Sequence, residues 1–116
     1  VDPVRLNVAK IHRVLANLLS NGLRYTPDGG SIWVTAVRTP DGVVVTVRDS
    51  GAGFNAVDLP RVFEQFYRGE QARTRAAGGA GLGLAIAQAI VGAHNGRIWA
   101  ENVPGGGALV GFLLPD

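Results

Sequence analysis

The chain has 116 residues, the size of a single domain, and 47% of them are hydrophobic, which is enough for a small core. It contains no cysteine, which excludes disulfide bridges and any cysteine-based metal site or nucleophile. A net charge of +2 is too small to indicate a nucleic-acid partner, and no apolar run reaches the roughly 18 residues that a membrane-spanning helix needs. Nine of the 17 glycines form three short clusters, at residues 51–53, 78–83 and 105–107, which favours turns or close approach of the backbone to a ligand.

The first half of the chain predicts a helix followed by a β-hairpin. Residues 10–25 carry apolar side chains at spacings of three and four, which is typical of one buried helix face. The turn signal at residues 27–30 ends this helix. Residues 31–38 and 43–49 are rich in valine, isoleucine and threonine and predict two strands, joined by the Thr-Pro-Asp-Gly turn at residues 39–42.

The second half predicts two helices and another hairpin. A short helix is expected at residues 58–65, capped by Asn55 or Asp58. Residues 69–80 have little apolar content beyond alanine and predict a mobile loop. Residues 82–94 predict a helix that is apolar nearly all round and therefore well buried. Strands at residues 97–102 and 108–114 are joined through a proline and three glycines.

This order of elements predicts an α/β (α+β) two-layer sandwich, in which about three helices cover one face of a mixed, mostly antiparallel sheet. No repeat or linker divides the chain, so residues 1–116 are expected to form one monomeric domain. Residues 1–8 are weakly patterned and are interpreted as a truncated strand or a linker. The missing initiator methionine indicates a fragment of a longer protein.

Three polar residues share one flank of the first predicted helix. Asn17, Asn21 and Arg24 are spaced four and three residues apart, so they lie together beside the apolar face. Amide oxygens are hard ligands that suit Mg²⁺, and arginine suits phosphate. Taken alone, this set also fits an exposed flank that only aids solubility.

A carboxylate followed by glycines ends the second predicted strand, in the sequence DSGAG at residues 49–53. On a pocket floor, Asp49 can accept a hydrogen bond from the exocyclic amine of adenine and so discriminate against guanine. A simple strand-ending turn is the alternative. The G-x-G-x-x-A pattern of residues 51–56 also matches a dinucleotide-binding fingerprint, but its neighbours form a hairpin rather than a βαβ unit. A P-loop is excluded, since the only lysine, Lys10, follows no glycine pattern.

Two further segments flank the predicted loop. Residues 79–84, with the sequence GAGLGL, open the second long helix, and glycines at a helix N-terminus suit phosphate binding. Close packing of the helix on the sheet is the alternative. Residues 63–68, with the sequence FEQFYR, place two phenylalanines that anchor the loop or fill the core, and Arg68 within reach of a phosphate. Neither His12 nor His94 has a neighbouring carboxylate, so neither is a candidate nucleophile.

In this order and at these spacings, the segments resemble the catalytic and ATP-binding domain of bacterial sensor histidine kinases. That domain belongs to the superfamily shared with DNA gyrase, HSP90 and MutL, and the resemblance covers residues 11–115. Residues 12–21 resemble its N box, residues 49–53 its first glycine box, residues 63–68 its F box and residues 79–83 its second glycine box. The F box points to histidine kinases within the superfamily.

The resemblance implies a Bergerat-type ATP-binding fold with ATP and Mg²⁺ as ligands. It places Asn21 on the Mg²⁺ that bridges the phosphates, with Asn17 on the metal or its waters. Asp49 would bind the adenine amine, Gly53 would leave room for the ring, and residues 69–80 would form the ATP lid. Catalytic contributions are implied for Asn17, Asn21, Arg24 and Arg68. The full set of implied nucleotide-binding residues is Asn17, Asn21, Arg24, Tyr25, Asp49, Gly51, Gly53, Arg68, Gly79, Gly81, Leu82 and Gly83.

The resemblance also implies partners. The γ-phosphoryl group would go to a histidine on a helical dimerisation domain of the same protein, for relay to an aspartate of a response regulator. Nothing in this chain matches that phosphoacceptor, so the isolated chain is expected to bind ATP without phosphorylating itself. The implied location is the cytoplasmic portion of a membrane-anchored protein. An anti-sigma-factor-like serine kinase and a nucleotide-binding regulatory module without catalysis remain alternatives.

Three positions depart from the family pattern. Gly22 stands where alanine is usual, Phe54 stands where an aliphatic residue is common, and Ala108 replaces a frequent threonine after Gly107. None of them is an implied ligand contact.

Overall fold

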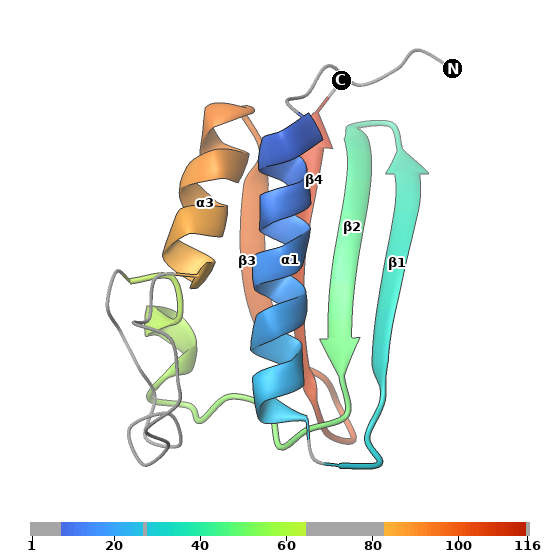
Figure 1. Ribbon diagram of the computed structural model, residues 1–116, viewed down its shortest axis with the longest axis vertical. Helices are drawn as coiled ribbons and strands as arrows, with labels where there is room; N and C mark the ends of the chain where they lie inside the picture. The colour runs from blue at the N-terminus through green and yellow to red at the C-terminus, as the bar shows by residue number, and fades with distance from the viewer. Residues whose placement is uncertain (1–7, 27, 65–82, 116) are drawn as a thin grey trace.

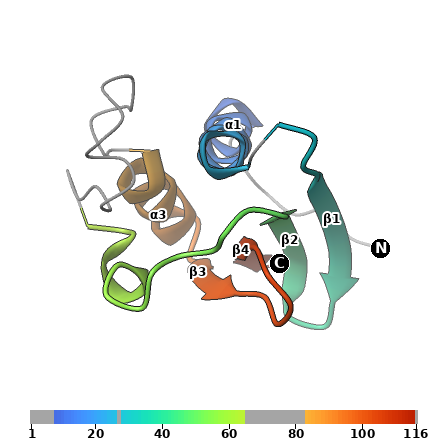
Figure 2. The ribbon, with the colours of Figure 1, turned by 90° about the horizontal axis from the view of Figure 1, so that it is seen from below.

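The computed structural model describes residues 8–26, 28–64 and 83–115, which form two layers (Figure 1). One layer is a four-stranded antiparallel sheet with the strand order β1-β2-β4-β3. Both α-helices of the described residues lie on the same face of this sheet (Figure 2). The elements are α1 (Val8–Tyr25), β1 (Ile32–Thr39), β2 (Gly42–Asp49), the 3₁₀ helix η1 (Leu59–Arg61), α3 (Gly83–Ala93), β3 (Arg97–Asn102) and β4 (Ala108–Pro115).

The predicted sandwich, with helices on one face of the sheet, is confirmed. Both hairpins form where they were expected, with β1 paired to β2 and β3 paired to β4. Pairing of β2 with β4 joins the two hairpins into one sheet. The prediction allowed a mixed sheet, whereas all four described strands are antiparallel. None of the described helices is long and apolar enough to cross a membrane.

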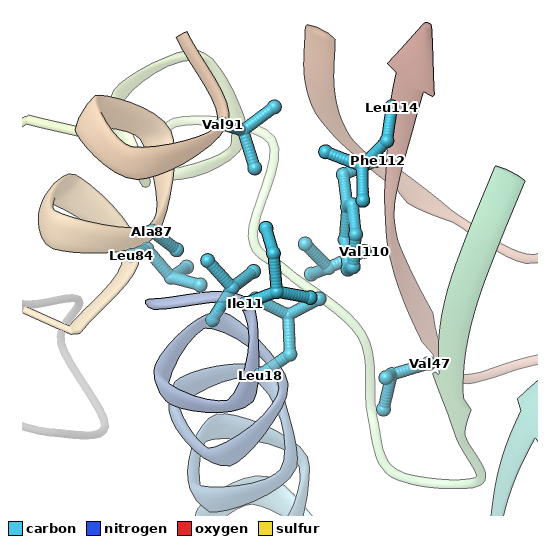
Figure 3. Packing of buried hydrophobic residues seen from close by; sticks show 10 residues of the cluster. Ile11, Leu18, Val47, Leu84, Ala87, Val91, Val110, Phe112 and Leu114 are labelled. Carbon is cyan, nitrogen blue, oxygen red and sulfur yellow. The ribbon is translucent and has the colours of Figure 1, made fainter. Parts of the chain in front are cut away.

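The core lies between the helices and the inner face of the sheet (Figure 3). Its fully buried side chains come from α1, α3 and β4, and they are Val14, Leu18, Val91 and Phe112. Ala87 of α3 is also fully buried, and this small side chain allows α3 to pack closely against α1. The periodicity of residues 10–25 therefore predicts the buried face of α1 correctly.

Two local predictions are wrong. Instead of a helix over residues 58–65, the described residues 58–64 contain only the 3₁₀ turn η1, and Asp58 at its N-cap makes no side-chain capping hydrogen bond. So short a segment gains too few hydrogen bonds to offset the cost of starting an α-helix. The helix α3 is buried on one face only, because Gln88, Ala89 and Gly92 are exposed. Alanine and glycine make a sequence look apolar while offering little surface to bury.

Replacing Gly22 in α1 by alanine is expected to stabilise the domain. Gly22 is buried, and an added Cβ would lie 3.4 Å from Ile32 Cδ1 and 3.9 Å from Val47 Cγ1, which are ordinary contacts. Alanine is favoured over glycine in a helix interior, so Gly22→Ala should raise the free energy of unfolding by about 0.5–1 kcal/mol.

Urea denaturation measures this change. Gly92→Ala in α3 is the matched control, since an added Cβ there meets nothing within 4 Å and reports helix propensity alone. A fall in stability for Gly22→Ala but not for Gly92→Ala would show that Ile32 cannot accommodate the methyl group.

Candidate functional site

The candidate site lies at one end of the molecule, where the ends of several elements meet (Figure 1). The end of β2 lies beside the start of β4, because Arg48 pairs with Leu109. The end of β3 joins them through the pairing of Asn102 with Ala108. Asn17 of α1 reaches the first residue of α3. Three strand ends that lie apart in sequence therefore meet around Asp49, while the contact of Asn17 joins α1 to α3.

Asp49 is the buried charged group of this site, with 5% of its surface exposed. Its Oδ1 accepts hydrogen bonds from the backbone N–H of Gly51 at 2.8 Å and of Ala108 at 3.4 Å. No described residue donates a hydrogen bond to its Oδ2. Because a buried acceptor left without a donor is costly, Oδ2 is suited to receive a donor from a ligand.

Gly107 makes the approach of β4 to Asp49 possible. Its φ is +91°, a conformation that favours glycine, and an added Cβ would lie only 2.0 Å from the Asp49 carbonyl oxygen. The carbonyl oxygen of Gly107 accepts a hydrogen bond from Val103 N at 2.9 Å, which closes the turn between β3 and β4. This packing brings the N–H of Ala108 to the Asp49 carboxylate.

The loop that follows Asp49 is held at both of its ends. Ser50 N donates to Ser31 O at 3.0 Å, and Ser31 N donates to Ser50 Oγ at 2.8 Å. At the other end, the side chain of Asn102 makes two hydrogen bonds to the backbone of Phe54. Gly53 has a φ of +82°, and an added Cβ would lie 2.8 Å from Asn102 Oδ1, so this glycine has a packing role of its own.

The amides of α1 lie one helical turn apart on a half-buried flank. Asn17 Nδ2 donates to Gly83 O at 3.1 Å, which links α1 to the start of α3. The side-chain oxygens of Asn17 and Asn21 accept no hydrogen bond from another described residue. Arg24 lies half-buried in the last turn of the same helix. The helix α1 thus carries Asn17, Asn21 and Arg24 on one flank, as their spacing predicts.

These amides fit Mg²⁺ only as part of its coordination shell. Amide oxygens are hard ligands of the kind that Mg²⁺ accepts. The described residues contain no group of three or more acidic, histidine or cysteine side chains that could hold a metal by themselves. A metal at Asn17 and Asn21 would therefore need phosphate oxygens and water to complete its shell, as Mg²⁺ usually does.

The contacts above join the predicted site residues in two groups. Asp49, Gly51 and Gly53 belong to the end of β2 and the loop after it, and Asn17 is joined to Gly83 at the start of α3. Phe63 packs against the core, which fits both interpretations given for it. The predicted residues outside the described part of the structure are Arg68, Gly79, Gly81 and Leu82, together with the side chain of Tyr25 and loop 69–80.

Sequence reasoning missed Asn102, Ser31 and Ala108. Each contributes through a contact with a residue far along the chain, and Asn102 is 48 residues from its partner Phe54. No local spacing reveals such a contact. The one available signal was the run of glycines before Ala108, which indicated a tight turn but not what the turn approaches.

Comparison with known proteins shows to which family this chain belongs. Residues 7–116 match the family described as histidine kinase-, DNA gyrase B-, and HSP90-like ATPase. The sensor histidine kinase WalK of Bacillus subtilis (strain 168) is 42% identical over 114 residues, which cover 97% of this chain and 19% of WalK. The mycobacterial sensor histidine kinase MprB superposes with a TM-score of 0.85 at 28% identity, over 97% of this chain and 76% of the MprB chain.

A third similar protein is full-length ShkA, whose structure in complex with AMPPNP superposes with a TM-score of 0.76 at 30% identity, over 91% of this chain and 21% of the ShkA chain. The chain thus belongs to the family of histidine kinase-, DNA gyrase B- and HSP90-like ATPases. Its resemblance to the catalytic domain of sensor histidine kinases is confirmed. The chain spans about a fifth of the length of WalK.

Proposed function

We propose that this chain binds ATP with Mg²⁺ and that the full-length protein uses it to phosphorylate a histidine on a helical dimerisation domain. From there the phosphoryl group would pass to an aspartate of a response regulator. The observation that carries the proposal is Asp49, a buried carboxylate with one oxygen held by two backbone N–H groups. Its other oxygen is left for a donor such as the adenine amine.

The remaining residues are assigned by their chemistry. Asn21, assisted by Asn17, would hold Mg²⁺ against the phosphates, and the metal would neutralise charge that develops during transfer. Arg24 and Arg68 would contact phosphate, and Tyr25 would lie against the nucleotide. The glycines before α3 would let the phosphates approach its N-terminus, and residues 69–80 would cover the nucleotide as a lid. The work of the domain is positioning and charge stabilisation.

The phosphate acceptor would come from another domain. His12 is exposed on α1, and His94 uses its Nδ1 in a 2.9 Å contact with the Ile90 carbonyl oxygen. Neither histidine is among the residues described above around Asp49. The isolated chain should therefore bind ATP yet acquire no stable acid-labile phosphate, and phosphohistidine appearing on this chain alone would contradict the proposal.

The role of Asn21 is tested by the dependence of ATP affinity on Mg²⁺. Calorimetric titration of the unaltered chain should give tighter ATP binding with Mg²⁺ than with a chelator. Asn21→Ala should reduce the increase in ATP affinity that Mg²⁺ produces by about tenfold, because one metal ligand is lost. The helix itself should remain intact, because alanine favours helix formation. Ser20→Ala, at the exposed neighbouring position, is the control and should leave the Mg²⁺ effect unchanged. If the unaltered chain bound no ATP at all, the proposed function would be overturned.

A further inference from the structure

We propose that Asn102, at the end of β3, is a positioning residue for nucleotide binding. It would hold loop 50–54 so that Asp49 keeps its Oδ2 directed at the ligand. This inference rests on the proposed function, because it assigns the carboxylate of Asp49 to a nucleotide. Asn102 itself would touch no ligand and would act through the loop.

Two hydrogen bonds join the side chain of Asn102 to the backbone of Phe54, and together they form what we call the clasp. Phe54 N donates to Asn102 Oδ1 at 2.7 Å, and Asn102 Nδ2 donates to Phe54 O at 2.9 Å. One side-chain amide thus satisfies both backbone groups of a single residue, as a neighbouring β-strand would. The clasp joins the loop after β2 to the β3–β4 hairpin, 48 residues away in sequence.

The chemistry of this clasp is specific to asparagine. Aspartate has the same shape but no N–H to donate to Phe54 O, and glutamine is one methylene longer. The space is also restricted, since a Cβ at Gly53 would lie 2.8 Å from Asn102 Oδ1. The lack of a side chain at Gly53 therefore lets the amide reach the backbone of the loop.

The clasp is connected to both hydrogen bonds that orient Asp49. Ala108, which donates to Asp49 Oδ1, is the strand partner of Asn102. Gly51, which makes the shorter bond to the same oxygen, lies three residues before the clasped Phe54. Releasing Phe54 frees the loop on the Gly51 side while the Ala108 side stays fixed in the sheet. The carboxylate then loses a fixed orientation, and with it affinity for a ligand that needs Oδ2.

The test compares ATP affinity in Asn102→Ala and Asn102→Asp by calorimetry with Mg²⁺ at pH 7.5. Asn102→Ala should weaken binding about fivefold to tenfold, because the clasp is lost. Asn102→Asp should weaken it as much, because the carboxylate has no N–H to donate and its second oxygen opposes the Phe54 carbonyl oxygen.

Asn95→Asp is the matched control, since Asn95 is exposed just after the end of α3 and the substitution adds the same charge. It should show no deficit. Hydrogen exchange of the Phe54 amide reports the clasp directly and should accelerate in Asn102→Ala. Faster exchange at Phe54 with unchanged ATP affinity would overturn the positioning role, as would unchanged ATP affinity in Asn102→Asp. Absence of ATP binding by the unaltered protein would instead overturn the proposed function, and the positioning role with it.

Discussion

Asp49→Asn is expected to lower the affinity for ATP by about 1–3 kcal/mol, or roughly 5- to 150-fold. The two backbone N–H groups at Oδ1 require an acceptor, so the amide oxygen of the new side chain should take that position. The amide nitrogen then replaces Oδ2. Two donors, this nitrogen and the adenine amine, would face each other at the point of recognition.

Calorimetric titration with ATP and with inosine triphosphate tests this expectation. Inosine carries a carbonyl oxygen where adenine carries its amine, so the preference for ATP should fall or reverse in Asp49→Asn. Asp41→Asn, at the exposed turn between β1 and β2, is the matched control and should keep the preference of the unaltered protein. Unchanged ATP affinity in Asp49→Asn would remove this carboxylate from the site.

Gly107→Ala is expected to cause a large loss of stability, of roughly 3 kcal/mol or more. The added Cβ would lie 2.0 Å from the backbone carbonyl oxygen of Asp49, in a residue whose φ is +91°. Neither partner is the flexible end of a side chain, so the β3–β4 turn would have to move away from β2. That movement would also withdraw the N–H of Ala108 from Asp49 and weaken nucleotide binding.

Gly105→Ala separates the two causes of this loss. Gly105 also has a φ of +91°, but an added Cβ there meets nothing within 4 Å. Its cost should be that of the backbone conformation alone, about 1 kcal/mol. Urea denaturation of both variants measures the difference, which belongs to the contact with Asp49. Equal losses would show that close approach of the two backbones is unimportant.

The fold was largely predictable because its elements have strong local patterns. The periodicity of residues 10–25 identifies the face of α1 that carries Val14 and Leu18, and the turn at residues 39–42 identifies the first hairpin. The failures occurred where local pattern is a poor guide to tertiary structure. The segment around Leu59 is too short to propagate a helix, and α3 is apolar in composition but exposes one side.

The residues proposed to bind the ligand could be singled out from the sequence, whereas the residues that support them could not. Asp49, Asn17 and Asn21 could be singled out, since each combines a reactive group with a position at a strand end or on a helix flank. Asn102 could not be found in this way, because its role depends on Phe54 and on the pairing of β3 with β4. The bond from Asn17 to Gly83 O was equally hidden, since it depends on the packing of α3 against α1.

The central claim is that an adenine nucleotide binds at the end of the molecule formed around Asp49. Its most direct test is a titration of the unaltered chain with ATP and Mg²⁺, followed through the backbone amide signals in NMR spectra. We predict saturable shifts at Gly51, Ala108 and Asn21, and none at the opposite end of the sheet, where Thr39 pairs with Gly42. An unchanged spectrum, or shifts confined to the Thr39–Gly42 end, would contradict the account.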